Sequence, residues 1–177
     1  MKKHLLYLFS AVMLVFSACT KLETEELISE DAVLKKAEIP LNFRAHLSPD
    51  QEVHEVESQA TGQAVFQLSK DGTELSYKLI VANIENVTMA HIHLAPAGVN
   101  GGVVAWLYPA SAPPQLIPGT SNGILAEGTI TVSSLVGPLA GQPLSALVDA
   151  IKEGRTYVNV HTSAYPAGEI RGQIWGN

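Results

Sequence analysis

Apolar and polar residues alternate along most of the chain after residue 40, with the two-residue period of half-buried β-strands. In residues 41–47, for example, every second position is apolar (Leu41, Phe43, Ala45 and Leu47). Further strand-like runs occupy residues 64–68, 75–81, 89–95, 125–132, 157–162 and 169–175, and residues 103–108 are continuously apolar, as in a buried strand. The pattern predicts about eight short strands.

Turn signals separate these runs. The Asp71-Gly72 pair between two alternating runs predicts a hairpin. Residues 83–86 predict a second turn that ends one strand before the next begins. Residues 51–61 are polar, residues 95–102 are rich in glycine, and residues 109–123 contain four prolines, so each predicts a loop or irregular connection.

One stretch has a helical period instead. Apolar residues at i, i+3, i+4 and i+7 predict a short amphipathic helix, with Gly154 placed to end it (Leu144, Leu147, Val148 and Ile151). Many short strands with turns and a single helix indicate an all-β protein, an antiparallel β-sandwich or Greek-key barrel.

The N-terminus has the features of an export signal. Lys2 and Lys3 precede an apolar run over residues 5–16, which is too short for a stable membrane anchor. Small residues then lead to Cys19, an arrangement that resembles the bacterial lipobox. We expect residues 1–18 to be a lipoprotein signal peptide and Cys19 to be the lipid attachment site; the alternative is an ordinary signal peptide with a stray cysteine.

The remainder divides into a tether and a domain. Residues 19–40 are rich in charged residues and have little pattern, which predicts an acidic, solvated tether before a domain at residues 41–177. Because Thr20 is not an aspartate that would favour retention at an inner membrane, we expect an outer-membrane location. The net charge of −6 and the lack of a basic cluster argue against nucleic acid as a partner.

The candidate chemistry lies in two histidine-bearing runs. His91 and His93 are two residues apart, so a strand would present both on one face. His161 ends another predicted strand and is the candidate third member. Neutral imidazole is a common ligand for copper and zinc, so these histidines are candidate metal ligands.

These runs carry a family resemblance. Residues 90–93, and residues 157–162 followed by residues 166–174, resemble the CHRD domain, and the resemblance extends from Leu41 to Trp175. It implies a Greek-key β-sandwich similar to copper/zinc superoxide dismutase. It implies no established bacterial activity.

The similarity to superoxide dismutase also points to copper, because that enzyme takes ligands from a His-x-His pair and a distant histidine. However, the loop over residues 95–102 contains no histidine or aspartate, and Cys19 is the only cysteine. Dismutase activity is therefore not expected.

A structural interpretation of the histidines remains open. One of His91 and His93 would then bond a carbonyl of the glycine-rich loop, and His161 would do so for the loop near Tyr165 and Pro166. His46 and His54 are expected to be solvated.

Two other features have ordinary interpretations. Glu169 and Arg171 lie two residues apart and are expected to form an ion pair with each other or with a neighbouring strand, although Arg171 is also a candidate anion contact. Trp106 and Trp175 are expected to pack in the core or at a sheet edge.

Two functions compete on this basis. The first is a non-enzymatic envelope module, held at the membrane by lipidated Cys19, that binds a protein or glycan. The second is a copper- or zinc-binding protein using His91, His93 and His161. A metal-dependent enzyme is a weaker third possibility, because no general base can be named.

Overall fold

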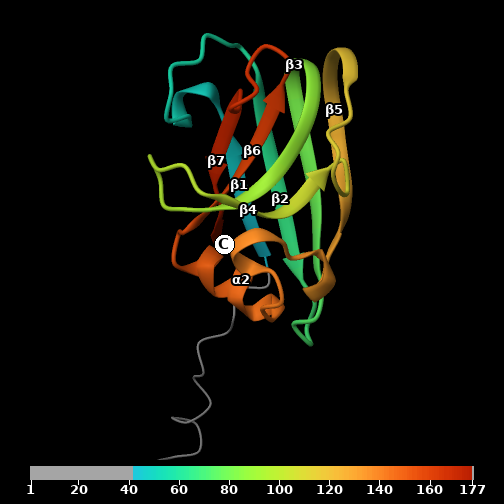
Figure 1. The fold of residues 1–177 in the computed structure, drawn as a ribbon, viewed down its shortest axis with the longest axis vertical. Coiled ribbons are helices and arrows are strands. Elements are labelled where there is room, and N and C mark those ends of the chain that lie inside the picture. Colours follow the sequence, from blue (N-terminus) through green and yellow to red (C-terminus); the bar gives the residue numbers. More distant parts are fainter. Residues whose placement is uncertain (1–41, 177) are drawn as a thin grey trace, which may run out of the picture. The chain divides into compact units, whose positions relative to one another are not determined.

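The computed structural model describes residues 42–176, which form eight strands and one α-helix together with three short 3-10 helices (Figure 1). The predicted signal peptide, Cys19 and tether lie outside the described residues. The strands are β1 (Asn42–Leu47), β2 (Thr61–Leu68), β3 (Leu75–Leu94), β4 (Gly102–Tyr108), β5 (Ile117–Ile130), β6 (Thr156–Thr162), β7 (Ile170–Gln173) and β8 (Trp175–Gly176). The helix α2 is Leu144–Lys152, and the 3-10 helices are η1 (Pro49–Gln51), η2 (Val132–Ser134) and η3 (Gly137–Leu139).

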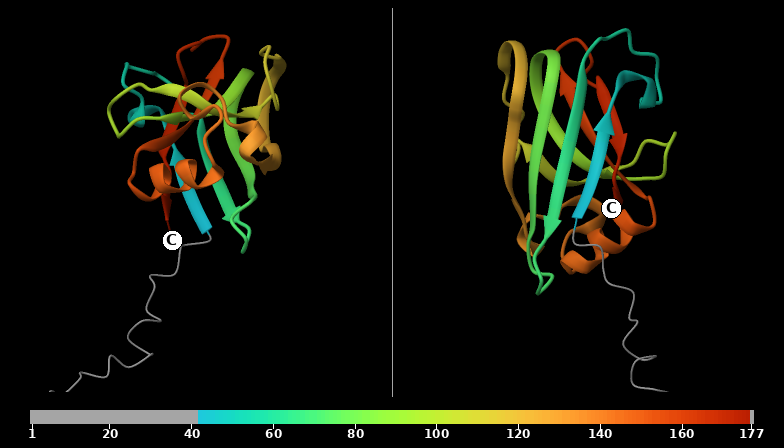
Figure 2. Two further views of the ribbon diagram at one scale, coloured as in Figure 1. Left: turned by 60° about the horizontal axis from the view of Figure 1, so that its bottom comes forward. Right: turned by 180° about the vertical axis from the view of Figure 1, so that it is seen from behind.

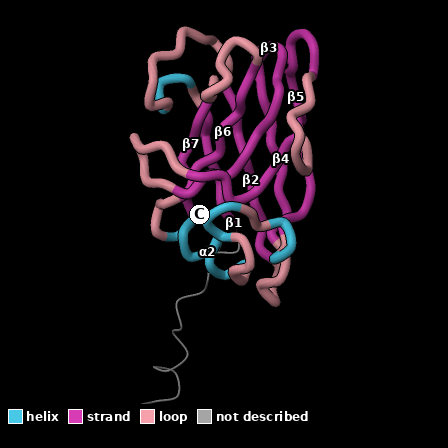
Figure 3. The backbone as a smooth tube through the Cα atoms, viewed as in Figure 1, coloured by secondary structure: helices cyan, strands magenta, loops and turns pink. Residues whose placement is uncertain are grey.

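The long strand β3 is shared by two groups of strands (Figure 2). Its first half pairs with β2 and β5, whereas its second half pairs with β6 and β4. All of these pairings are antiparallel, and the hydrogen-bonded order runs β7-β6-β3-β2-β1-β8. The result is a strongly curved, nearly closed sheet, as the strand tube shows (Figure 3).

The predicted turn at residues 83–86 does not end a strand, and that prediction is wrong. β3 runs through this region for 20 residues. Asn83 and Asn86 take positive φ angles of 56° and 52°, a conformation that asparagine tolerates better than most residues. Their backbone and side chains bond to β5 and its neighbours, with Asn86 Oδ1 accepting from Gly119 N at 2.9 Å. The residues therefore bend the strand and interrupt its register without releasing it.

The proline-rich connection is also shorter than predicted. Residues 117–123 belong to β5, which extends from Ile117 to Ile130. Pro118 is accommodated because β5 pairs with β3 alone and so has a free edge that needs no donor. The prediction failed because proline excludes a residue from a central strand but not from an edge strand.

The all-β, antiparallel class with one short helix is confirmed. Alternate residues of β1 and β2 are buried, as their sequence period predicts. Helix α2 buries its apolar face, with Leu144, Leu147 and Ile151 among its buried residues. The Greek-key order and the similarity to superoxide dismutase stay predictions. Among the described residues, no helix is long and apolar enough to cross a membrane.

β1 and β7 close the sheet by approaching each other at one point. Ser48 and Arg171 exchange backbone hydrogen bonds of 3.0 and 3.1 Å. Next to this bridge, a Cβ on Gly172 would lie 2.1 Å from the carbonyl oxygen of His46. Only glycine permits this close approach, because the obstructing atoms are backbone.

We expect Gly172→Ala to destabilise the domain by about 3 kcal/mol, since backbone on β1 must shift to admit the methyl group. Denaturant unfolding of the full chain measures the change. Gly98→Ala is the matched control: its Cβ meets nothing within 4 Å, and only its positive φ of 74° opposes alanine, at about 1 kcal/mol. Equal losses of unfolding free energy in Gly172→Ala and Gly98→Ala would contradict the inference that β1 and β7 must approach closely at Gly172.

Candidate metal centre

The second half of β3, with β6 and β7, has one apolar and one polar face. Ala90, Ile92, Val158, Val160 and Ile170 point into the core. The intervening positions carry polar groups that are nevertheless buried: His91, His93, Asn159, His161, Arg171 and Gln173. We call this set the buried polar face. Its members come together because β3 pairs with β6, and β6 with β7, in one fixed register.

Two segments bond to the buried polar face from outside. In the loop over residues 95–101, the carbonyls of Ala95, Pro96 and Val99 accept hydrogen bonds from Gln173 and Arg171. In the segment over residues 49–58, Glu52 Oε1 accepts from Asn159 Nδ2 at 2.7 Å. These bonds explain how a polar face can be buried without a large desolvation penalty.

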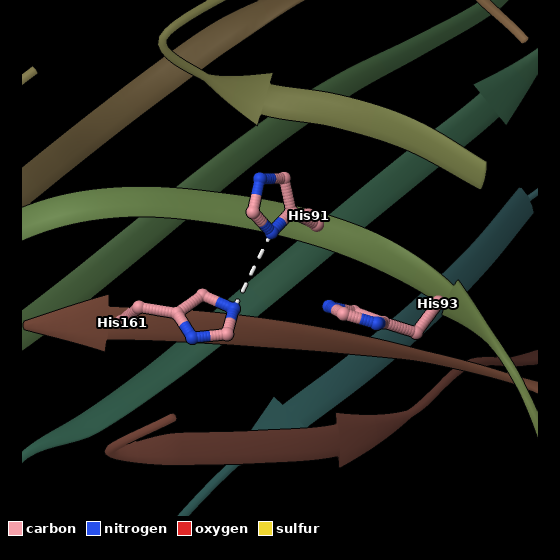
Figure 4. Close-up of side chains that lie close together, drawn as sticks. All are labelled: His91, His93 and His161. Atoms are coloured by element: carbon pink, nitrogen blue, oxygen red, sulfur yellow. Dashed lines mark hydrogen bonds between the residues drawn. The ribbon is translucent and has the colours of Figure 1, made fainter. Parts of the chain in front are cut away.

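The three predicted histidines do meet (Figure 4). One ligand atom from each lies within 4.8 Å of those of the other two, and the residues are 3%, 9% and 6% exposed (His91, His93 and His161). His161 lies directly across from Met89 and so diagonal to His91, a spacing that aromatic side chains can bridge. The geometric part of the metal-ligand prediction is thus satisfied.

His93 and His161 are each oriented by a backbone carbonyl. The Nδ1 of His93 bonds to Gly101 O at 3.0 Å, and the Nδ1 of His161 bonds to Pro166 O at 3.0 Å. Since a carbonyl can only accept, both Nδ1 atoms carry the proton, and each neutral ring keeps a lone pair on Nε2. The bonds expected from the structural interpretation are therefore present for these two residues, and they leave the Nε2 of each ring without a proton.

His91 has no such carbonyl partner. Its Nδ1 faces the Nε2 of His161 at 3.3 Å. Its Nε2, like that of His93, is buried and has no hydrogen-bond partner. An unpaired polar atom in a buried position is unfavourable, so the site holds more coordinating capacity than the fold itself uses.

All three rings are held neutral. Burial, followed by the neighbouring histidines, lowers the pKa of His91 to about 3. Burial lowers the pKa of His161 to about 4 in spite of its bond to Pro166. The pKa of His93 is also lowered, mainly by burial. Neutral imidazole is the form that binds metals, so no proton has to be displaced at pH 7 from an imidazolium.

Aromatic side chains border the cluster. The Trp106 ring meets the His91 ring edge-on with centroids 4.2 Å apart. The Tyr157 ring stacks on His93 at 4.8 Å and 9°. On Tyr157, in turn, the guanidinium carbon of Arg171 lies 3.4 Å from the ring centroid. Sequence reasoning did not connect Tyr157 or Trp106 with the histidines. Strand alternation could have placed Tyr157 on the same face as His161. The position of Trp106 depends on the register between β3 and β4.

Arg171 does not form the predicted ion pair with Glu169, and that prediction is wrong. It is 1% exposed and donates hydrogen bonds to the loop carbonyls and to the side chains of Asn100 and Gln173. The Glu169 carboxylate instead accepts from Ser58 and Thr162. The prediction assumed a solvated face, whereas loop packing buries both side chains.

The remaining candidates lie away from this cluster. His46 and His54 are exposed, as predicted. Trp175 is 55% exposed on the edge strand β8, and Trp106 is half-buried.

The arrangement is chemically suited to one metal ion. Two nitrogens bound to one ion at about 2.0–2.1 Å lie roughly 3.3–3.6 Å apart, which the His91 and His161 atoms already satisfy. Metal-binding histidines commonly donate their other N–H to a backbone carbonyl, as His93 and His161 do. The residues present therefore fit a copper or zinc ion.

We expect the metal-free protein to lose stability as the pH falls from 6.5 towards 5. Unfolded histidines take up protons near pH 6.5, whereas the buried ones stay neutral until about pH 4 (His161) and about pH 3 (His91), so acid favours the unfolded state. Each such histidine removes up to about 1.4 kcal/mol per pH unit. Denaturant unfolding at several pH values, with chelator present, measures the slope.

A variant separates the contribution of His91 to this pH dependence of stability from those of other groups. The raised pKa of Glu52, caused by burial, acts in the opposite direction, because protonation of that carboxyl favours the folded state as the pH falls. His91→Gln should give a shallower slope, and His46→Ala should not change it. A slope that His91→Gln leaves unaltered would contradict the assignment.

The comparisons with known proteins give one result. The CHRD domain matches residues 43–174, most of the chain and nearly all of its described part. Searches of curated proteins and of solved structures gave no match. The matched range contains every strand of the buried polar face and all three histidines. The chain therefore belongs to the CHRD domain family.

Proposed function

We propose that this CHRD protein is a lipid-anchored cell-envelope module that binds one copper or zinc ion through His91, His93 and His161. CHRD is not a known enzyme family, and the proposed role is binding without catalysis. Storage, delivery or tolerance of the metal are the roles that such a site would serve.

One observation carries the metal assignment: one nitrogen of each buried ring lies within 4.8 Å of those of the other two, with His91 Nδ1 facing His161 Nε2 at 3.3 Å and His93 Nε2 without a hydrogen-bond partner. If the histidines served only to hold loops and one another, the bonds of His93 to Gly101, of His161 to Pro166 and of His91 to His161 would suffice, and the buried His93 Nε2 would have no role. A bound ion would satisfy a lone pair on each ring at once.

The test is equilibrium dialysis of the full chain against zinc(II), copper(II) and, without oxygen and with a reductant, copper(I), followed by metal analysis. We expect one equivalent of at least one ion to be retained and to be lost in His93→Ala. Cys19→Ala should be present in every sample, because a free thiol would itself bind copper. His46→Ala, which alters an exposed histidine, should keep the full equivalent.

Retention of none of the three ions would overturn the metal proposal. The histidines would then be scaffold, and the search would turn to an envelope protein or glycan as the ligand. In that case His93→Ala should lower the midpoint of thermal unfolding without any effect on metal content.

The anchoring part of the proposal rests on the sequence. Lys2 and Lys3, the apolar run over residues 5–16 and the small residues before Cys19 support an export signal with lipid attachment. Lipid chains on Cys19 would provide enough buried hydrocarbon for stable attachment. We place the protein in the outer membrane because Thr20 follows the cysteine.

Growth of the producing cells with a labelled fatty acid tests the anchor. We expect label in the wild-type protein, none in Cys19→Ala, and normal labelling in the control Ser10→Ala, which only removes a hydroxyl from the apolar run. Density-gradient separation of the membranes then reports which one holds the protein. Label that persists in Cys19→Ala would refute lipid attachment at this residue.

A further inference from the structure

We infer that the ion held by the three histidines is copper(I), and that the thioether of Met89 is placed to complete its coordination. This inference rests on the proposed metal function and specifies the ion for that same site. It comes from the position of Met89, the charge of the ligand set and the burial of the cluster.

Met89 is half-buried and, by strand alternation, is on the same side of β3 as His91 and His93. It belongs to β3 two residues before His91, while Ala90 between them points into the core. The register of β3 and β6 sets Met89 directly opposite His161. Side chains paired in this way have Cβ atoms about 4.5–5.5 Å apart, and methionine has three rotatable side-chain bonds with which to move its sulfur.

The chemistry of these groups favours copper(I) over zinc(II). Thioether sulfur is a soft ligand that selects copper(I), and imidazole suits copper as well as zinc. Met89 is half-buried and is the only methionine of the described residues; the other two, Met1 and Met13, precede them.

The charge of the surroundings also favours a monovalent ion. The cluster consists of three imidazole rings and no carboxylate. The carboxylates of Glu52 and Glu169 accept hydrogen bonds from Asn159 and Thr162 instead. The buried Arg171 guanidinium already places a positive charge on the other side of the Tyr157 ring, which stacks on His93.

The free energy of burying an ion rises with the square of its charge, so a dication costs about four times as much to desolvate as a monocation in this site. Zinc(II) usually offsets that cost with thiolate or carboxylate ligands, or keeps a bound water in an open position. Here the ligands are neutral, and the three histidines are at most 9% exposed. Copper(I) costs less to bury than zinc(II) and has less need of a charged ligand, because it carries a single charge.

Competition with chromophoric chelators specific for copper(I) and for zinc(II) tests the inference, using the full chain with Cys19→Ala under anaerobic conditions. We expect copper(I) to bind at least about 100-fold more tightly than zinc(II). Met89→Leu preserves an apolar side chain of similar volume, and we expect it to weaken copper(I) binding by about 10- to 100-fold while leaving the weak zinc binding unchanged.

X-ray absorption provides a readout that a packing role would not affect. Copper(I) in the wild-type protein should show one sulfur neighbour at about 2.3 Å in addition to nitrogens, and Met89→Leu should show nitrogens alone. Leu94→Met, on the opposite side of the same strand, is the matched control and should not restore the sulfur signal to Met89→Leu.

The outcomes separate the two proposals. Zinc(II) bound as tightly as copper(I), or a copper site whose spectrum has no sulfur in the wild type, overturns this inference while the three-histidine metal function survives. Failure of zinc(II), copper(II) and copper(I) alike to bind overturns the proposed function itself. A folded Met89→Leu variant, shown by an unchanged unfolding midpoint without metal, is required for the comparison and is expected because the substitution conserves volume.

Discussion

The register in which β3 pairs with β6 is the constraint on which the rest of the structure depends. Because side chains alternate along a strand, a slip of β6 by one residue would turn Val158 and Val160 out of the apolar core and put polar residues such as His161 in their place. The apolar face of these strands thus fixes where the polar face lies. The same register sets His161 diagonal to His91 and opposite Met89, so the core specifies the site without any residue of the site contributing to the core.

Burial of the polar face imposes a second requirement, because each polar atom removed from water needs a partner. Arg171 meets it with carbonyls of the loop over residues 95–101, and Asn159 meets it with Glu52. In doing so, Arg171 orders the loop whose Gly101 carbonyl orients His93. The loop's own Gly101 N–H donates to the Tyr157 hydroxyl at 3.1 Å, which ties the loop to the ring that stacks on His93. The hydrogen bonds that cover the face are therefore the ones that set the direction of the candidate ligands.

The unpaired histidine nitrogens differ from the hydrogen-bonded groups around them. Within the buried polar face, the Nε2 atoms of His91 and His93 and the Oδ1 of Asn159 have no hydrogen-bond partner. The unpaired state of the histidine nitrogens lowers stability in the absence of a ligand and increases the gain when a ligand binds. Metal binding at this cluster would be coupled to folding, since the orientations of the rings depend on the loops that cover the strands. The cluster sits within the family's matched range, so the site is part of the domain and not an insertion into it.

The sequence by itself determined the fold class, most of the strands and the helix, because alternation and helical periodicity reflect a partition between core and surface that needs no knowledge of neighbours. It also identified His91, His93 and His161, since residue type and spacing along one strand are local properties. It failed at residues 83–86 and 117–123, where Asn83, Asn86 and Pro118 act as turn formers locally but are held within strands by pairing to β3 and β5. Only the tertiary structure decided that the face bearing Arg171 and Glu169 is buried, that Trp106 and Tyr157 border the histidines, and that Met89 lies across from His161. These relations join segments far apart in sequence, and they depend on strand register and loop packing, which a period of two cannot encode.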